Sequence, residues 1–157
     1  MGFATDYRFV WLGGFTAGTL DILFAIGYWA VKAHVPAQRI LQSVAAGLLG
    51  KASFSGGWGT ALLGLALHFF IATCMAFAYC LVAQRWGGLQ KYPLPYGAVY
   101  GLALYLVMNY VVIPLSAAGS SSSPDLLWIS LGVLVHMLFI GVPIALAVNR
   151  ALAPASH

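Results

Sequence analysis

The sequence has very few charged residues. Only 6% of its 157 residues are charged, whereas 62% are hydrophobic, and all three acids are aspartates. A soluble domain has about 25% charged residues. The composition therefore excludes an ordinary soluble domain and predicts a single all-α membrane domain over residues 1–157.

The sequence also lacks the motifs of several functional classes. The seven Lys and Arg residues are scattered and form no basic run, which argues against nucleic acid as a partner. Cys74 and Cys80 lie in one apolar run and cannot meet in regular helical geometry, so we expect neither a disulfide nor a CxxC redox pair. No GxSxG, Walker or dinucleotide-binding pattern is present, so we expect no enzymatic activity of these kinds.

Long apolar runs dominate what remains. A helix needs about 20 apolar residues to cross the hydrocarbon layer of a bilayer. Four runs are long enough to span, and they cover residues 9–31, 60–84, 96–117 and 126–148. We therefore predict a polytopic protein of four transmembrane helices embedded in the lipid bilayer.

The segment between the first two spans is amphipathic. Over residues 36–50, Ile40, Leu41 and Val44 share one helical face, while Gln42 and Ser43 lie around the other. The segment is too short to span, so it predicts an interfacial helix or a shallow re-entrant segment.

The loops indicate an orientation. Four spans place both termini on one side of the membrane. The connection after the third span, residues 118–123, has no Lys or Arg, as expected of an outer loop. Both termini are therefore predicted to be cytoplasmic, and the inner side then holds Arg8, Arg85, Lys91 and Arg150.

Glycines recur at helical spacing in every span. Small residues let transmembrane helices approach closely, so we predict that these glycines lie at helix contacts. They are Gly14, Gly18, Gly64, Gly97, Gly101 and Gly132. Four short helices make a thin scaffold, so a homo-oligomer is a further expectation.

Each span also contains a polar residue. Counting 1.5 Å per residue from the predicted helix ends places Asp21, His68, Asn109 and His136 in one layer near the middle of the membrane. Tyr105 lies one turn before Asn109 on the same face. Ionisable residues inside a membrane are by default a functional-site hypothesis, so we expect these five residues to form one buried polar cluster.

Several roles fit such a cluster. The first is a proton or ion relay in a small transport-like or accessory protein, because Asp and His change protonation at modest cost. The second is a b-type haem site with His68 and His136 as axial ligands, in which Gly64 and Gly132, one turn before each histidine, would give the macrocycle room. A metal bound by Asp21, His68 and His136 has suitable ligand types but no tight ligand spacing. The last alternative is a structural assembly partner, in which the polar residues only hold helices together.

Three local features predict helix geometry. Pro143 is expected to kink the fourth span, because the carbonyl of Phe139 loses its usual donor. Pro114 lies near the end of the third span, where a lost backbone bond costs least. Ser123, followed by Pro124 and an acid, predicts a helix start with Ser123 as the N-cap.

From about Gly57 to Val148 the chain resembles the YagU-like family of bacterial inner-membrane proteins. The resemblance rests on Gly57, on the stretch from His68 through Phe77–Cys80 to Ala83, on Pro114-Leu115 and on His136. It implies a multi-pass protein of the bacterial inner membrane and marks His68 and His136 as the residues most worth testing. The family pattern has a histidine where this chain has Asn109, and the first 56 residues have no counterpart in it.

Overall fold

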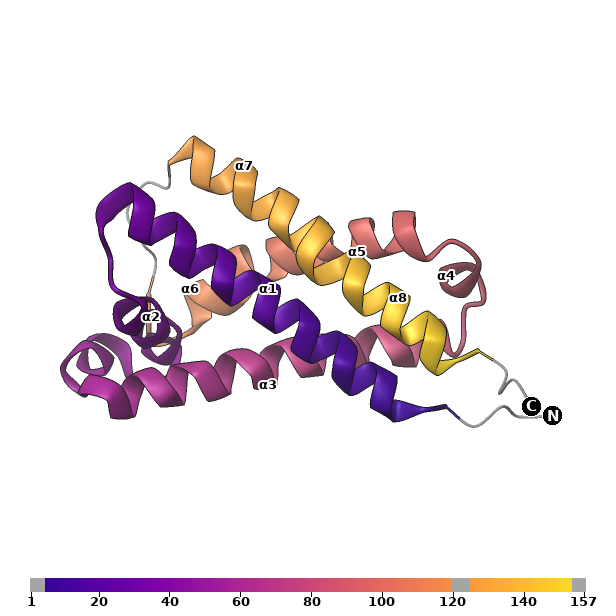
Figure 1. The fold of residues 1–157 in the computed structure, drawn as a ribbon, viewed down its shortest axis with the longest axis horizontal. Coiled ribbons are helices and arrows are strands. Elements are labelled where there is room, and N and C mark those ends of the chain that lie inside the picture. Colours follow the sequence, from indigo (N-terminus) through magenta and orange to yellow (C-terminus); the bar gives the residue numbers. More distant parts are fainter. Residues whose placement is uncertain (1–4, 120–124, 154–157) are drawn as a thin grey trace.

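The computed structural model describes residues 5–119 and 125–153, and within these ranges the chain is helical with no strand (Figure 1). Four long stretches of helix dominate the fold. The elements in chain order are α1 (Tyr7–Ala33), α2 (Ala37–Leu49), the 3-10 helix η1 (Gly50–Ser55), α3 (Gly57–Ala83), α4 (Gly88–Lys91), α5 (Pro93–Val107), the π-helix η2 (Met108–Val112), α6 (Ile113–Leu115), α7 (Leu126–Val135), the π-helix η3 (His136–Gly141) and α8 (Val142–Ala151).

Four helices are long and apolar enough to cross a membrane. They are α1, α3, the continuous stretch from Pro93 to Leu115, and the stretch from Leu126 to Ala151. At 1.5 Å per residue, the 27 residues of α3 extend about 40 Å, against a hydrocarbon layer of about 30 Å. The prediction of four spans is confirmed at this level, and each observed stretch begins and ends within a few residues of the predicted run.

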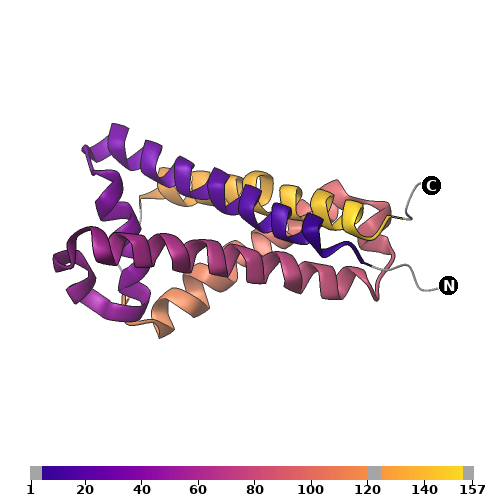
Figure 2. The same cartoon turned by 60° about the horizontal axis from the view of Figure 1, so that its bottom comes forward.

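The beginning of α1 and the end of α8 lie at the same end of the bundle (Figures 1 and 2). The amide of Asp6 donates to the carbonyl of Ala151 at 3.0 Å. The Asp6 carboxylate also caps α1 by accepting from the Arg8 amide, and it pairs with the Arg8 guanidinium at 2.8 Å. This hydrogen bond to Arg8 lowers the pKa of the Asp6 carboxyl.

The four spans do not form a square bundle. α1 packs along α3 and α8, and α5 packs along η3 and α8, whereas α3 meets α8 more than it meets α5. The second and third spans are linked by Tyr100 of α5, whose hydroxyl donates to the Met75 carbonyl of α3 at 2.8 Å. The diagonal relation of the second and fourth spans, on which the haem hypothesis depends, is therefore absent.

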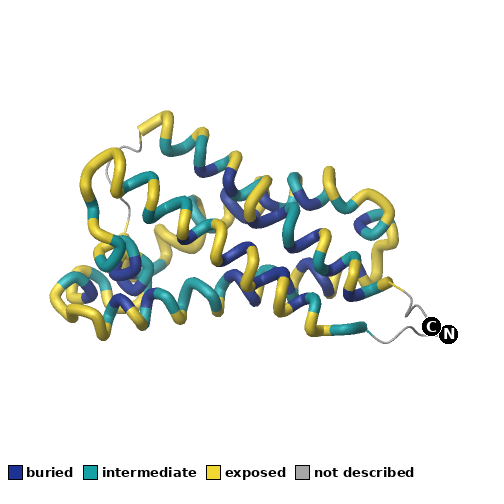
Figure 3. The backbone as a smooth tube through the Cα atoms, viewed as in Figure 1, coloured by how far each residue is buried: buried dark blue, intermediate teal, exposed yellow. Residues whose placement is uncertain are grey.

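The packed core occupies one half of the bundle, on the side of the α1 start and the α8 end (Figure 3). Its largest fully buried side chains include Tyr79, Ile144, Val10 and Val148. The opposite half has only a small cluster of Ile22, Leu41 and Ala61. The bundle is consequently dense at one end and more open at the other.

Glycines lie where helices approach most closely. A β-carbon at Gly14 would lie 2.7 Å from the Cα of Thr73 in α3, and one at Gly101 would overlap the His136 carbonyl. The β-carbon of an alanine at Gly97 would likewise meet Ala145 at 2.8 Å. These positions leave no room for a side chain, so helices pack through them backbone against backbone.

The segment after α1 forms helix α2, which runs across the open end of the bundle (Figure 2). Leu41 of the predicted apolar face is buried, but so is Gln42, which was assigned to the polar side. Gln42 is only 4% exposed and donates through Nε2 to the Gly57 carbonyl at 2.9 Å and to Thr60 Oγ1 at 3.3 Å. These bonds fix α2 to the start of α3, because a buried amide is stable only with its hydrogen bonds made.

Asp125, and not Ser123, is the N-cap of α7. Its carboxylate accepts from the Leu127 amide at 3.0 Å and forms an ion pair with Lys32 at the end of α1. The expected cap at Ser123 lies outside the described residues. Cys74 is exposed and Cys80 is buried, and both are free cysteines.

Candidate functional site

A cavity of about 400 Å³ lies between the spans, on the α2 side of the packed core. All four spans contribute to its wall, and α2 contributes Ser43, Val44 and Gly47. Ile140, which belongs to the packed core, lies at its closed side.

The five polar residues predicted from the sequence all line this cavity. Asp21 comes from α1, His68 from α3, Tyr105 from α5, Asn109 from η2 and His136 from η3. The expected buried cluster is different in one respect: Tyr105 is buried, but both histidines, Asp21 and Asn109 are half-buried and face the cavity. The side chains of these four half-buried residues are therefore accessible to a molecule inside the cavity.

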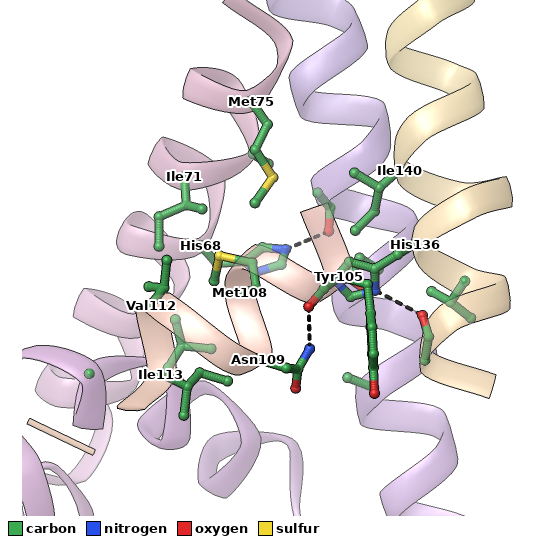
Figure 4. Close-up of a pocket in the computed structure, with 18 of the residues that line it drawn as sticks. His68, Ile71, Met75, Tyr105, Met108, Asn109, Val112, Ile113, His136 and Ile140 are labelled. Carbon is green, nitrogen blue, oxygen red and sulfur yellow. Dashed lines mark hydrogen bonds between the residues drawn. The ribbon is translucent and has the colours of Figure 1, made fainter. Parts of the chain in front are cut away.

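His68 reaches across from α3 to α1. Its Nε2 lies 2.8 Å from the carbonyl oxygen of Gly18 (Figure 4). A carbonyl only accepts, so Nε2 carries the proton and the neutral ring keeps Nδ1 as an acceptor. Gly18 has no β-carbon, and one there would lie 3.0 Å from the ring of Phe69, the residue after His68. A larger residue at position 18 would therefore crowd this contact between α1 and α3.

His136 bonds to its own helix. Its Nδ1 donates to the carbonyl of Gly132 at 2.9 Å, which leaves Nε2 as the free nitrogen of the neutral ring. Tyr105 packs edge-on against the imidazole at a centroid distance of 5.2 Å. Asp21 and His68 line the same cavity as His136.

Asp21 is the unpaired acid among the aspartates. Asp6 pairs with Arg8 and Asp125 pairs with Lys32. In the part of the chain that the structure describes, Asp21 has neither an ion pair nor a hydrogen bond, although it lies on the cavity wall. An ionised carboxylate away from bulk water is costly unless it is paired. We therefore expect the Asp21 carboxylate to bind a proton or a cation.

Two π-turns carry polar residues of the site. Asn109 lies in η2, where its Nδ2 donates to the Tyr105 carbonyl at 2.9 Å, and His136 is the first residue of η3. Each π-turn is followed at once by a proline near the start of the next helix, Pro114 in α6 and Pro143 in α8. A proline removes a backbone donor and crowds the preceding turn, so the helix widens there.

A π-turn precedes Pro143, where the sequence predicted a kink. A full π-turn also precedes Pro114, which lies near the end of its span as predicted. Such turns are frequent at functional sites because they shift side chains out of regular helical register.

The space that a haem would need is filled by protein. A β-carbon at Gly64 would overlap the backbone carbonyl of Leu41 in α2, and one at Gly132 would lie 3.0 Å from the Tyr105 ring. In addition, Nε2 of His68 is already bonded to Gly18. The arrangement therefore does not fit the two-histidine haem site that the sequence suggested.

A protein-built metal site is also unsupported. Over residues 5–119 and 125–153, no three His, Cys, Asp or Glu side chains are placed to hold a metal ion. His68 and His136 lie on one cavity but do not form a ligand set with a third group.

Some residues of the cavity were not anticipated. Phe24 and Trp128 line it, and their rings stack at a centroid distance of 6.1 Å with an interplanar angle of 12°. Phe24 lies three residues after Asp21, on the same face of α1. The spacing of Phe24 from Asp21 could be read from the sequence. The stacking of Phe24 on Trp128 could not, because it depends on how α1 and α7 pack.

No family model, no curated protein and no solved structure matches this chain. The resemblance to the YagU-like family stays a prediction, and the site has to be interpreted from its own geometry.

Proposed function

We propose that this protein is a small transport-like protein of the bacterial inner membrane, in which Asp21, His68 and His136 pass protons through the cavity. The observation that supports the proposal most strongly is the unpaired carboxylate of Asp21 on a cavity wall shared with two histidines. Each histidine uses one ring nitrogen for a backbone carbonyl and keeps the other free. Three protonatable groups from three different helices thus face one space.

The chemistry of a relay follows from these groups. A carboxylate accepts a proton from the cavity, and the free nitrogen of each neutral imidazole is a further proton acceptor. Asn109 and Tyr105 carry polar groups that can order water beside them. Asp and His chains inside helical bundles mark proton pathways in pumps and transporters.

The fold supports a pathway with one open and one closed side. The cavity extends to α2 and to Ser116, whereas the packed core closes the bundle toward the α1 start. With both helix ends cytoplasmic, the open side faces the periplasm. Transport then requires the packed side to open, for which the π-turns of η2 and η3 are suitable hinges because their backbone is already out of regular register.

The test is proton flux into liposomes that contain the purified full-length protein and a trapped pH dye, with a pH gradient and a potassium diffusion potential. We expect flux in the wild type and its loss in Asp21→Asn. Asp6→Asn is the matched control, since it removes a carboxylate that pairs with Arg8 outside the cavity. Equal flux in wild type, Asp21→Asn and empty liposomes would contradict the relay and leave a structural assembly partner as the better interpretation.

A further inference from the structure

We infer that the cavity binds a small organic monocation with an aromatic or aliphatic body, held by Asp21 and by the aromatic rings of Phe24 and Trp128. This inference rests on the proposed function in one respect, since it names the class of substrate for the same cavity.

The first reason is charge. The cavity wall includes no Lys or Arg, and Asp21 is its one carboxylate among the described residues. An anion would find no positive partner there, and a neutral occupant would leave the carboxylate unpaired.

The second reason is the character of the wall. Most of its residues are apolar, as in typical small-molecule sites, which combine a hydrophobic lining with a few placed polar groups. A volume of about 400 Å³ lies within the usual range of such sites. A divalent metal ion is usually held by several carboxylate or imidazole ligands, and among the described residues no three His, Cys, Asp or Glu side chains are placed to hold one.

The third reason is that aromatic rings line the same cavity as the carboxylate. Phe24 follows Asp21 by about one turn of α1, and Trp128 of α7 stacks on Phe24. A cation at an aromatic ring is attracted by the ring's quadrupole, and tryptophan is the strongest partner. A cavity wall that combines one carboxylate with aromatic rings suits an ammonium group with an apolar substituent.

The cavity also has an apolar wall for the body of such a molecule. Met108, Val112 and Ile113 of the third span line it. The apolar substituent of the cation can lie along these residues while its charge pairs with Asp21.

The experiment is equilibrium dialysis of benzyltrimethylammonium against the full-length protein in nonionic detergent, with protein-free micelles as the blank. Two competitors of matched shape are neopentylbenzene, in which carbon replaces the charged nitrogen, and benzenesulfonate, which carries the opposite charge. We expect saturable binding that neither competitor displaces. Displacement by neopentylbenzene at equal concentration, or the absence of saturable binding, overturns the inference without recourse to any variant.

Variants locate the site. Asp21→Asn should raise the Kd about tenfold or more, because it removes the paired charge, while Asp6→Asn leaves the Kd unchanged. Trp128→Leu should raise the Kd about threefold, the size of one cation–π contact, and Trp58→Leu is its control, since Trp58 is 64% exposed and lies off the cavity. Circular dichroism and gel filtration establish that each variant is folded. Folded Asp21→Asn that binds with the wild-type Kd contradicts the assignment.

The two proposals fail separately. Proton flux that depends on Asp21, without saturable binding of the cation, overturns the substrate class and leaves the proton relay standing. Binding that depends on Asp21, without proton flux, supports the cation site and overturns the relay.

Discussion

Replacing Gly14 by alanine tests the packing of α1 on α3, which forms one wall of the cavity. The added β-carbon would lie 2.7 Å from the Cα of Thr73 and 3.2 Å from its amide nitrogen. Carbon atoms pack at about 3.5–4.0 Å, so the two helices must separate by roughly 1 Å. Both obstructing atoms belong to the backbone, which cannot move aside as a flexible side chain does.

The magnitude follows from two opposing effects. Overpacking costs about 1–3 kcal/mol, while glycine-to-alanine in a helix interior gains about 0.5–1 kcal/mol. We expect Gly14→Ala to lose about 1–2 kcal/mol of stability. Gly27→Ala, on the same helix, is the control: no atom lies within 4 Å of its β-carbon, so it should gain up to about 1 kcal/mol.

The assay is thermal unfolding in detergent, followed by circular dichroism on matched samples. The separation between the two variants should amount to about 1–3 kcal/mol, with Gly14→Ala below the wild type and Gly27→Ala at or above it. If Gly14→Ala is as stable as Gly27→Ala, the backbone of α1 does not lie against Thr73. Asp21, which lies two turns further along α1, would then not be expected to face the cavity.

Three further changes probe other parts of the molecule, each by the same unfolding measurement. A double-mutant cycle of His68→Gln and His136→Gln should give a coupling free energy of at least about 0.5 kcal/mol, the lower limit for residues in one network. Strictly additive losses of stability would show that the two histidines are independent. Gln42→Ala should cost about 1–2 kcal/mol, because it leaves the Gly57 carbonyl and Thr60 with fewer bonds, whereas Gln38→Ala on the same helix should be nearly neutral. Tyr79→Phe should gain about 1 kcal/mol, because the Tyr79 hydroxyl is buried with no hydrogen-bond partner among the described residues; a loss would mean that a partner exists.

The positions of the spans could be predicted from the sequence because a bilayer fixes helix length. The run around His68 has no charged residue between Thr60 and Gln84, and the observed α3 ends at Ala83. The same constraint brings Asp21, His68, Asn109 and His136 to one level of the bundle, and they line one cavity because each also lies on a face turned toward the other spans. Their role in transport is a proposal that the flux and binding experiments test.

Other features depend on packing that no local pattern encodes. Gln42 lies between Leu41 and Ser43 on an amphipathic segment, and helical periodicity assigns it to the polar side. It is nevertheless buried, because α2 rests on the start of α3, where Gly57 and Thr60 offer an acceptor each. Gly64 allows this contact, since only a residue without a β-carbon lets the Leu41 carbonyl approach α3. The sequence shows both residues but not that they face each other.

The hollow half of the bundle has a physical cause in the distribution of its contacts. Toward the α1 start, small residues such as Ala17, Ala76 and Ala145 let three spans close around Tyr79. Around the cavity, two spans widen into the π-turns η2 and η3, which precede Pro114 and Pro143, and each turn presents a polar residue where a packed core would need an apolar one. Filling that space with protein would bury Asp21 without a partner, at a cost of several kcal/mol. The same sequence features that weaken the packing therefore keep the carboxylate accessible, and the open half of the bundle is where binding and proton transfer have to be sought.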